Sequence, residues 1–464
     1  MTGFFDFIKE QDMCLFTDFY ELAMCASYLD NKKLELATFD LLIRNMPRYR
    51  SYFLFAGLEQ VLLFLKNIRF TDKHLLYLRK QGFSTNFLDY LQNFRFTGDV
   101  WAFPEGSIAF QNEPLIRITA PIIEAQIVET FLLNTINLQT MIATKASRIV
   151  EAAKGKPVIE FGLRREHGID AGMKVARCSF IAGCEGTSNV LAGKKYGIPL
   201  FGTMAHSFIM SYEQEIDAFR AFTKTFPDKT TLLIDTYDEI GGVNNAILIA
   251  KELEKLGYKL GGVRLDSGNL AKTSKKIRNL LDNNDLAYVK IFASGDLDEF
   301  KITKLLEKIA RIDFFGVGTK LGTSADRPYL DVIYKLCEIM NNKGVFSPIM
   351  KLSEAKTTFP GRKQVYRFKD ASGNFAYDIV ALDKESLTGE SLLIKVMENG
   401  ELIYTFPSIE RIRNYAKASL QKLPAKYKKI NTPQKYPVQL SQNLETLTRK
   451  LLIQLGKKKI NSKI

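Results

Sequence analysis

TLLIDTYD at residues 231–238 and LGGVRLDSG at residues 260–268 are the stretches that decide the fold. Each is a short apolar run ending in polar or glycine residues, which is typical of a buried parallel strand followed by a turn. The pattern recurs as PVIEFGLRR (157–165), IPLFGTMAH (198–206), VKIFASGDLD (289–298) and IDFFGVGTK (312–320). Their polar ends lie 39, 32, 31, 30 and 22 residues apart, room for one strand and one crossover helix each time. These units predict a parallel sheet, which we expect to close as an irregular TIM-like α/β barrel.

The chain on either side of this series lacks the strand–helix rhythm. A chain of 464 residues exceeds what one hydrophobic core usually supports, so we expect two domains. Residues 136–339 are predicted to form the barrel, and residues 1–135 with 340–464 a flanking α+β domain. The expected elements of the flanking domain are a helix over 17–30, a strand over 36–44, a helix over 56–67 and short strands over 100–120. A helical stretch over 121–153 leads into the barrel.

Composition argues against several classes of protein. No apolar run approaches the ~18 residues of a membrane span, and we expect no export signal. Five cysteines without CxxC spacing argue against a disulfide framework and a thiolate zinc site. We therefore expect a cytoplasmic protein.

The net charge of +14 is concentrated near the end of the sequence. Residues 411–464 contain 14 Lys/Arg and one acid, so residues 1–410 carry a net charge of only +1. A basic tail could bind polyanions, but we favour a solvated lysine face on C-terminal helices, so nucleic acid is not the expected partner.

Histidine is scarce, and His206 stands out among the three. No pair has metal-ligand spacing, and His74 lies in a helix-like surface segment. His206 follows an expected strand end in a glycine–threonine turn, where a barrel presents functional groups.

Three aspartates, Asp235, Asp266 and Asp296, end successive expected strands. Any one of them could be a helix N-cap, whereas together they could hold a metal, bind ribose hydroxyls or act as an acid/base pair. A glycine run at 316–318 could let backbone N–H groups approach a phosphate, but its spacing misses the dinucleotide fingerprint.

Seven motifs together closely resemble the nicotinate phosphoribosyltransferase family, from about residue 12 to about residue 450. The motifs are Thr17-Asp-Phe-Tyr20-Glu-Leu, Phe55-Ala-Gly-Leu-Glu59, Gly202-Thr-Met-Ala-His206-Ser, Ile234-Asp-Thr-Tyr-Asp238, Gly262-Val-Arg-Leu-Asp-Ser-Gly268, Phe315-Gly-Val-Gly-Thr319 and Val332-Ile-Tyr-Lys-Leu336. The resemblance implies that nicotinate attacks C1 of 5-phosphoribosyl 1-diphosphate, giving nicotinate mononucleotide and diphosphate for NAD biosynthesis. It also implies coupled ATP hydrolysis, Mg²⁺ held mainly through the diphosphate, and a homodimer with shared active sites.

The resemblance assigns a role to each candidate residue. Tyr20, from the neighbouring subunit, and Phe161 would sandwich the pyridine ring. Arg164, Thr203 and Arg264 would contact nicotinate or diphosphate. Further roles are ribose or magnesium binding for Asp235 and Asp266, the 5-phosphate pocket for Gly295, Asp296, Gly318 and Thr319, and transient phosphorylation by ATP for His206.

Specificity for the acid over the amide rests on fewer residues. Ser267-Gly268-Asn269 and Ser294-Gly295-Asp296 are closer to the sister nicotinamide enzyme. Ser188, however, stands where that enzyme carries a ring-contacting aspartate, and a missing carboxylate removes repulsion against nicotinate. We therefore favour nicotinate, with nicotinamide as the alternative; a quinolinate enzyme, a nicotinamide-nucleotide oxidoreductase and a polyanion-binding protein are further possibilities.

Overall fold

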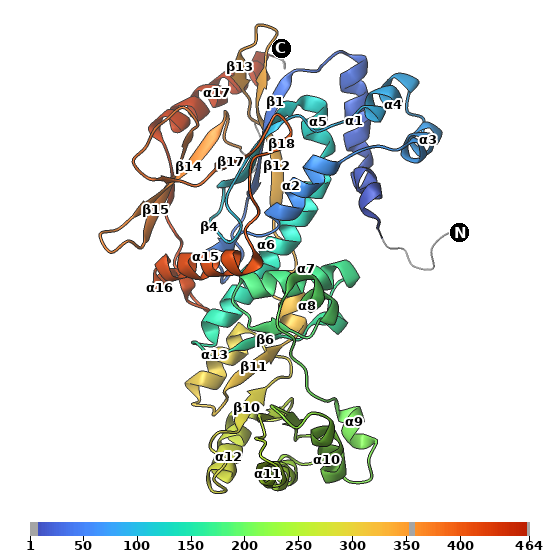
Figure 1. The fold of residues 1–464 in the computed structure, drawn as a ribbon. Coiled ribbons are helices and arrows are strands. Elements are labelled where there is room, and N and C mark those ends of the chain that lie inside the picture. Colours follow the sequence, from blue (N-terminus) through green and yellow to red (C-terminus); the bar gives the residue numbers. More distant parts are fainter. Residues whose placement is uncertain (1–7, 352–357, 462–464) are drawn as a thin grey trace. The chain divides into compact units, whose positions relative to one another are not determined.

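The computed structural model describes residues 8–351 and 358–461 (Figure 1). The chain divides into two compact units. The first, which we name the barrel unit after the predicted barrel, comprises residues 141–328 and 428–432. Of the other described residues, 8–140, 329–351, 358–427 and 433–461 form the flanking unit.

The barrel unit is built on a six-stranded parallel sheet with the order β7-β6-β11-β10-β9-β8. Apolar side chains of its strands, including Leu232, Val263 and Phe315, are fully buried. The strands are β6 (Val158–Glu160), β7 (Gly186–Thr187), β8 (Thr231–Leu233), β9 (Gly262–Leu265), β10 (Lys290–Ala293) and β11 (Phe314–Val317). The helices are η2 (Leu163–Arg165), α7 (Ile169–Ile181), α8 (Val190–Tyr196), α9 (His206–Met210), α10 (Glu215–Thr225), α11 (Glu239–Lys255), α12 (Leu270–Asp282), α13 (Glu299–Glu307) and α14 (Thr319–Gly322).

The strand expected at 198–201 is reduced to an isolated parallel bridge between Leu200 and Thr187 on β7. Pro199 offers no N–H to a ladder, which limits pairing there. Side-chain hydrogen bonds join the segment after Leu200 to the other end of the sheet. Thr203 accepts a hydrogen bond from Arg264 of β9, and His206 is hydrogen-bonded to Thr236 in the loop after β8. The backbone ladder is therefore open, among the described residues, where the predicted barrel would close.

The helices that follow the strands are capped by residues other than the three strand-end aspartates. Asp238, Asn269 and Asp298 accept backbone N–H groups at the starts of α11, α12 and α13. Asp235, Asp266 and Asp296 are thereby left for other contacts, which removes the simplest structural explanation for them.

The flanking unit contains a seven-stranded sheet with the order β13-β12-β1-β5-β3-β17-β18, a four-stranded sheet with the order β16-β14-β15-β19 and the two-stranded sheet β2-β4. A buried ion pair, Lys363 to Asp40 at 2.7 Å, joins β14 to β1. Its strands are β1 (Leu36–Ile43), β2 (Phe53–Leu54), β3 (Asp99–Ala102), β4 (Ile108–Ala109), β5 (Pro114–Pro121), β12 (Val332–Met340), β13 (Phe346–Pro348), β14 (Lys363–Lys369), β15 (Phe375–Leu382), β16 (Glu390–Ser391), β17 (Ile394–Glu398), β18 (Glu401–Leu402) and β19 (Val438–Leu440).

Most helices of the flanking unit lie near the two ends of the chain. They are η1 (Glu10–Leu15), α1 (Phe19–Asp30), α2 (Leu58–Asn67), α3 (Asp72–Lys80), α4 (Thr85–Gln92), α5 (Ile122–Ile127), α15 (Ile409–Lys422), α16 (Ala425–Lys428) and α17 (Gln442–Asn461), and α6 (Glu129–Ala152) runs from this unit into the other. None of the helices in the described residues combines the length and apolar character that a membrane span needs.

Candidate active site

Most of the predicted site residues follow the carboxyl ends of the parallel strands, which share one edge of the sheet. Arg264 lies within β9, and Thr203 and His206 follow the Leu200 bridge. In sheet order the others are Ser188 after β7, Phe161 and Arg164 after β6, Gly318 and Thr319 after β11, Gly295 and Asp296 after β10, Asp266 after β9 and Asp235 after β8.

Asp235 and Asp266 form a hydrogen-bonded network across three neighbouring strand ends. Asp235 Oδ2 accepts the backbone N–H of Asp266 at 2.7 Å and the hydroxyl of Ser267 at 2.8 Å. The hydroxyl of Ser294, after β10, donates to Asp266 Oδ1 at 2.5 Å. Asp235 Oδ1 is buried and has no hydrogen-bond partner among the described residues, so it can accept a ligand hydroxyl or a cation.

Arg264 brings a positive charge to the same edge. Its Nη1 donates to the hydroxyl of Thr203, and its Nη2 lies 4.0 Å from Asp266 Oδ1. Burial lowers the pKa of Arg264, an effect that the nearby Asp266 and Asp235 oppose. Its Nε–H is buried without a partner in the described part of the chain, so the guanidinium retains a donor for an anionic ligand.

His206 is half-buried at the start of α9. Its Nδ1 lies 3.1 Å from the hydroxyl of Thr236 in the loop after β8. Nε2 makes no hydrogen bond to the described residues, so one ring nitrogen is held and the other remains free to react.

Gly295 lies at a turn where a side chain cannot fit. Its φ is +91°, and a Cβ would lie 1.7 Å from the carbonyl oxygen of Asp266. Gly318 is similarly confined, since its Cβ would lie 2.8 Å from the carbonyl oxygen of Phe161. Both glycines therefore allow loops from neighbouring strands to approach each other closely at the predicted phosphate pocket.

Two lysines that sequence reasoning missed accompany Asp296. Its exposed carboxylate pairs with Lys301 at 2.6 Å and Lys320 at 3.2 Å, and these contacts lower the pKa of Asp296. Lys320 also contacts Asp298 at 3.1 Å. A lysine directly after Gly318-Thr319 was visible in the sequence, and it adds positive charge beside the glycine turns.

Phe161 is half-buried and has a fixed ring orientation. It packs edge to face on Phe292 of β10, with 5.6 Å between ring centroids and 78° between planes. A Cβ on Gly316 would lie 2.8 Å from the Phe161 ring, so this glycine gives the ring its space. Arg164, three residues on, is exposed, which leaves its guanidinium available to an anion.

A pair of carboxyl groups, Glu160 and Glu166, was also missed. Glu160 is buried at the end of β6, where it accepts the N–H of Gly162 and the hydroxyl of Thr187. Burial and the neighbouring Glu160 raise the pKa of Glu166 to about 9. The sequence contains no pattern that singles out these two glutamates, because the pKa of Glu166 is raised only by burial and by the proximity of Glu160 in the folded chain.

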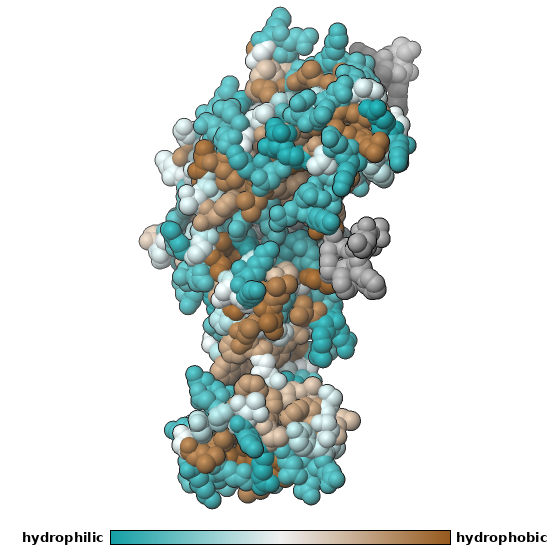
Figure 2. Space-filling model, turned by 45° about the vertical axis from the view of Figure 1, so that its right-hand side comes forward, coloured by the Kyte–Doolittle hydropathy of each residue, from teal (hydrophilic) through white to brown (hydrophobic). Residues whose placement is uncertain are grey.

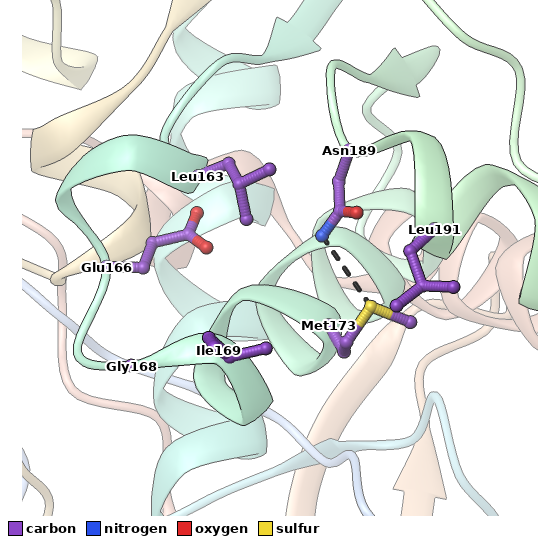
Figure 3. Close-up of a pocket in the computed structure, with 7 residues that line it drawn as sticks. All are labelled: Leu163, Glu166, Gly168, Ile169, Met173, Asn189 and Leu191. Atoms are coloured by element: carbon purple, nitrogen blue, oxygen red, sulfur yellow. Dashed lines mark hydrogen bonds between the residues drawn. The ribbon is translucent and has the colours of Figure 1, made fainter. Parts of the chain in front are cut away.

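A cavity of about 470 Å³ opens beside this pair. Figure 3 shows the Glu166 carboxyl group pointing toward the Leu163 side chain, with Asn189 beyond it. The remaining lining residues are Gly168, Ile169, Met173 and Leu191. Ser188 precedes Asn189 and is half-buried, with its N–H donated to the carbonyl oxygen of Glu160.

Tyr20 belongs to the flanking unit, on α1, and is 49% exposed. Burial of part of the ring and the nearby Glu129 raise the pKa of its hydroxyl, so the phenol stays protonated at neutral pH. Glu21, next to it, is buried and accepts hydrogen bonds from Thr17 and Thr130, which fixes the start of this helix.

Within the described ranges, no three His, Cys, Asp or Glu side chains converge as a ready metal centre. The buried, unpartnered Asp235 Oδ1 beside Asp266 nevertheless fits a hard cation such as Mg²⁺, which prefers oxygen ligands and is commonly shared with substrate phosphates.

The fold and these residues define an α/β protein whose strand ends carry hydrogen-bond acceptors and a cation suited to an anionic, hydroxyl-bearing small molecule. The chain belongs to the nicotinate phosphoribosyltransferase family. Family models match at residues 15–137 (N-terminal domain), 157–370 (family domain) and 386–448 (C-terminal domain).

Two relatives and one solved structure are similar to this chain over nearly its whole length. A nicotinate phosphoribosyltransferase of Mycobacterium tuberculosis is 46% identical over 440 residues, covering 94% of this chain and 93% of the relative. One from Bacillus subtilis is 39% identical and covers 94% of each chain. The crystal structure of human nicotinic acid phosphoribosyltransferase aligns with a TM-score of 0.83 at 27% identity, over 94% of this chain and 99% of that one.

Proposed function

We propose that the protein transfers the phosphoribosyl group of 5-phosphoribosyl 1-diphosphate to nicotinate. The pyridine nitrogen forms the new bond to C1 of the ribose as the bond from C1 to the diphosphate oxygen breaks, giving nicotinate mononucleotide and diphosphate. The observation that carries the proposal is the strand-end network of Asp235, Asp266 and Arg264, in a chain whose relatives bear the name of this activity.

The ring substrate needs positioning rather than a base, because its nitrogen already has a lone pair. Phe161 offers a fixed aromatic edge or face, and the exposed Arg164 offers a bidentate cation for the carboxylate. Thr203, held by Arg264, places a hydroxyl beside the same edge.

The sugar diphosphate requires hydroxyl acceptors and positive charge. Asp235 Oδ1 and Asp266 can accept ribose hydroxyls or hold Mg²⁺, which when bound would neutralise the leaving diphosphate. The Nε–H of Arg264, which has no partner among the described residues, can donate to the oxygen atoms of the leaving diphosphate. The close turns at Gly295 and Gly318, with Thr319 and Lys320 next to Gly318, suit the 5-phosphate.

ATP hydrolysis is assigned to His206. The Nε2 lone pair would take the γ-phosphoryl group of ATP and release ADP, and water would later remove that group as phosphate. The support is that Thr236 engages Nδ1 and leaves Nε2 without a partner among the described residues. A phosphohistidine adjoining the diphosphate site would let ATP change the affinity for substrates.

A homodimer completes the proposal. Figure 2 shows apolar residues gathered on the visible face of the molecule. In the barrel unit, the exposed apolar side chains include Leu163, Ile169, Val190 and Leu191, of which all but Val190 line the cavity. Such a patch favours a protein partner, and a second copy presenting its half-exposed Tyr20 would complete a ring-binding sandwich with Phe161.

The test is one assay with the purified protein, Mg²⁺, ATP and 5-phosphoribosyl 1-diphosphate, offering nicotinate, nicotinamide or quinolinate. Mononucleotide formation from nicotinate, at least about tenfold faster than from the other rings, is the expected result. Preference for nicotinamide would favour the sister activity indicated by Ser267-Gly268-Asn269. Turnover of none of the rings would overturn the proposal.

A further inference from the structure

The Glu166 side chain is seated against three glycines from three separate elements. Cβ atoms added to these glycines would lie 2.6 Å from Glu166 Oε1 at Gly162, 2.9 Å from Oε2 at Gly172 and 2.7 Å from both Cγ and Oε1 at Gly322. Gly162 precedes η2, Gly172 is in α7 and Gly322 ends α14. Only glycine at these three positions leaves enough space for the Glu166 side chain.

Glu160, at the end of β6, connects this region to the neighbouring strand β7. Its Oε2 accepts the Thr187 hydroxyl at 2.5 Å, and its carbonyl oxygen accepts the N–H of Ser188 at 3.0 Å. Its Oε1 also accepts the Gly162 N–H, so two donors favour the carboxylate form of Glu160 against burial, which raises its pKa. The Glu166 oxygens have no hydrogen-bond partner among the described residues. Oε1 of each glutamate lies against Gly162, since a Cβ added there would be 2.6 Å from Glu166 Oε1 and 3.0 Å from Glu160 Oε1. A proton on Glu166 would let the two adjacent carboxyl groups form a hydrogen bond.

The surroundings keep that proton in place. Burial, followed by the charge of Glu160, raises the pKa of Glu166 to about 9. Lysines of the two packed helices are engaged elsewhere: Lys174 of α7 pairs with Asp170, and Lys320 of α14 pairs with Asp296 and Asp298. Arg164, Arg165 and His167, on Glu166's own loop, are exposed.

We propose that Glu166, as a neutral carboxylic acid, is a positioning residue that links the loop bearing Phe161 and Arg164 to the turn bearing Gly318 and Thr319. The inference rests on the proposed function, since it couples the ring-binding loop to the phosphate-binding turn. Loss of the link loosens both loops, so affinity for both substrates falls together, whereas the reacting groups themselves are untouched.

Kinetics of two substitutions test the link. Glu166→Gln keeps a neutral hydrogen-bond donor and is expected to stay within about threefold of the wild-type KM values. Glu166→Ala is expected to raise the KM for nicotinate and for 5-phosphoribosyl 1-diphosphate by about tenfold or more each, with a smaller change in kcat. In the wild type both KM values should rise above pH 9 as Glu166 ionises, and in Glu166→Gln they should not. Equal kinetics and pH profiles in all three proteins would overturn the proposal.

A second pair of variants guards against a folding failure of Glu166→Ala. Gly322→Ala places a methyl group on the Glu166 side chain and should reproduce the rise in both KM values, while the double variant Gly322→Ala/Glu166→Ala should tolerate that methyl group without further loss. Additive effects of the two substitutions would contradict direct contact between these residues.

A measurement without substrate separates this inference from the proposed function. A carboxyl group whose pKa is raised in the folded state contributes stability that is lost as pH rises from its ordinary value toward 9. The Tm of Glu166→Gln should therefore gain on the wild-type Tm progressively from pH 5 to pH 9, whereas Glu213→Gln, at an exposed carboxylate, should show no such trend. A Tm difference independent of pH would overturn the claim that Glu166 is protonated in the folded protein. That result would not depend on the reaction that the protein catalyses.

Discussion

The Asp266 N–H donates a 2.7 Å hydrogen bond to Oδ2 of Asp235, so the ends of β9 and β8 are tied through one carboxylate. The tie fixes the direction of the second oxygen, Oδ1, which stays buried and unpaired among the described residues. A carboxylate held on one side and open on the other is preorganised for a ligand.

Asp235→Asn should therefore impair both catalysis and local order. In one orientation the amide nitrogen faces the Asp266 N–H and leaves that donor unsatisfied, at a cost of ~1–3 kcal/mol in stability. In the other orientation an N–H donor replaces the Oδ1 acceptor that the ligand needs. We expect kcat/KM for mononucleotide formation to fall by about a hundredfold or more. Asp228→Asn, at an exposed aspartate of the same unit, is the control and should keep its activity and Tm.

Gly295→Ala tests the close approach at the predicted phosphate pocket. Positive φ and a Cβ 1.7 Å from the Asp266 carbonyl oxygen should together cost more than about 4 kcal/mol, measured by denaturant unfolding. Gly257 has φ +81° with nothing within 4 Å, so Gly257→Ala isolates the backbone strain, at ~1–2 kcal/mol. Equal costs at the two sites would show that the steric contact is unimportant.

The strand–helix rhythm predicted β6, β8, β9, β10 and β11 because each combines a buried apolar run with a polar end. It missed β7, whose Gly186-Thr187 carries no apolar signal, and it predicted a strand near Leu200 where one bridge forms. Local pattern cannot report such pairing, which depends on how neighbouring strands meet.

His206→Ala should separate ATP hydrolysis from mononucleotide formation. The substitution removes the proposed phosphoryl acceptor from a half-buried position, so we expect little change in Tm and loss of the ATP stimulation of nicotinate affinity. His167→Ala, at an exposed histidine, should retain the stimulation. Acid-labile phosphate incorporated from γ-labelled ATP into the wild type, and absent from His206→Ala, would identify the residue; unchanged ATP dependence in the variant would remove His206 from this role.

Ser188→Asp should weaken selection for the acid. A carboxylate placed there repels the carboxylate of nicotinate in a partly desolvated pocket, so the ratio of kcat/KM for nicotinate over nicotinamide should fall by about ten- to a hundredfold. Ser188→Asn matches the size without the charge and should leave most of the ratio intact. A ratio that falls equally in both variants would point to size rather than charge.

The candidate residues at strand ends could be predicted because a parallel sheet places all its carboxyl ends on one edge. What they contact could not: the pairing of Arg264 with Thr203 joins positions 61 residues apart. The Glu160–Glu166 pair and the pairing of Lys301 and Lys320 with Asp296 could not be predicted either, since they arise from burial and proximity in the folded chain. The relation of Tyr20 to Phe161 remains a prediction, tested by complementation between Tyr20→Ala and Phe161→Ala chains in mixed dimers.

The central claim is transfer of phosphoribose to nicotinate at the strand-end network, and the most direct measurement is the stoichiometry of its two products. With nicotinate, 5-phosphoribosyl 1-diphosphate, Mg²⁺ and ATP, the wild-type protein is predicted to form nicotinate mononucleotide and diphosphate in equal amounts, and Asp235→Asn to lose both together. Diphosphate released without nicotinate mononucleotide, or mononucleotide formed at the wild-type rate by Asp235→Asn, would contradict it.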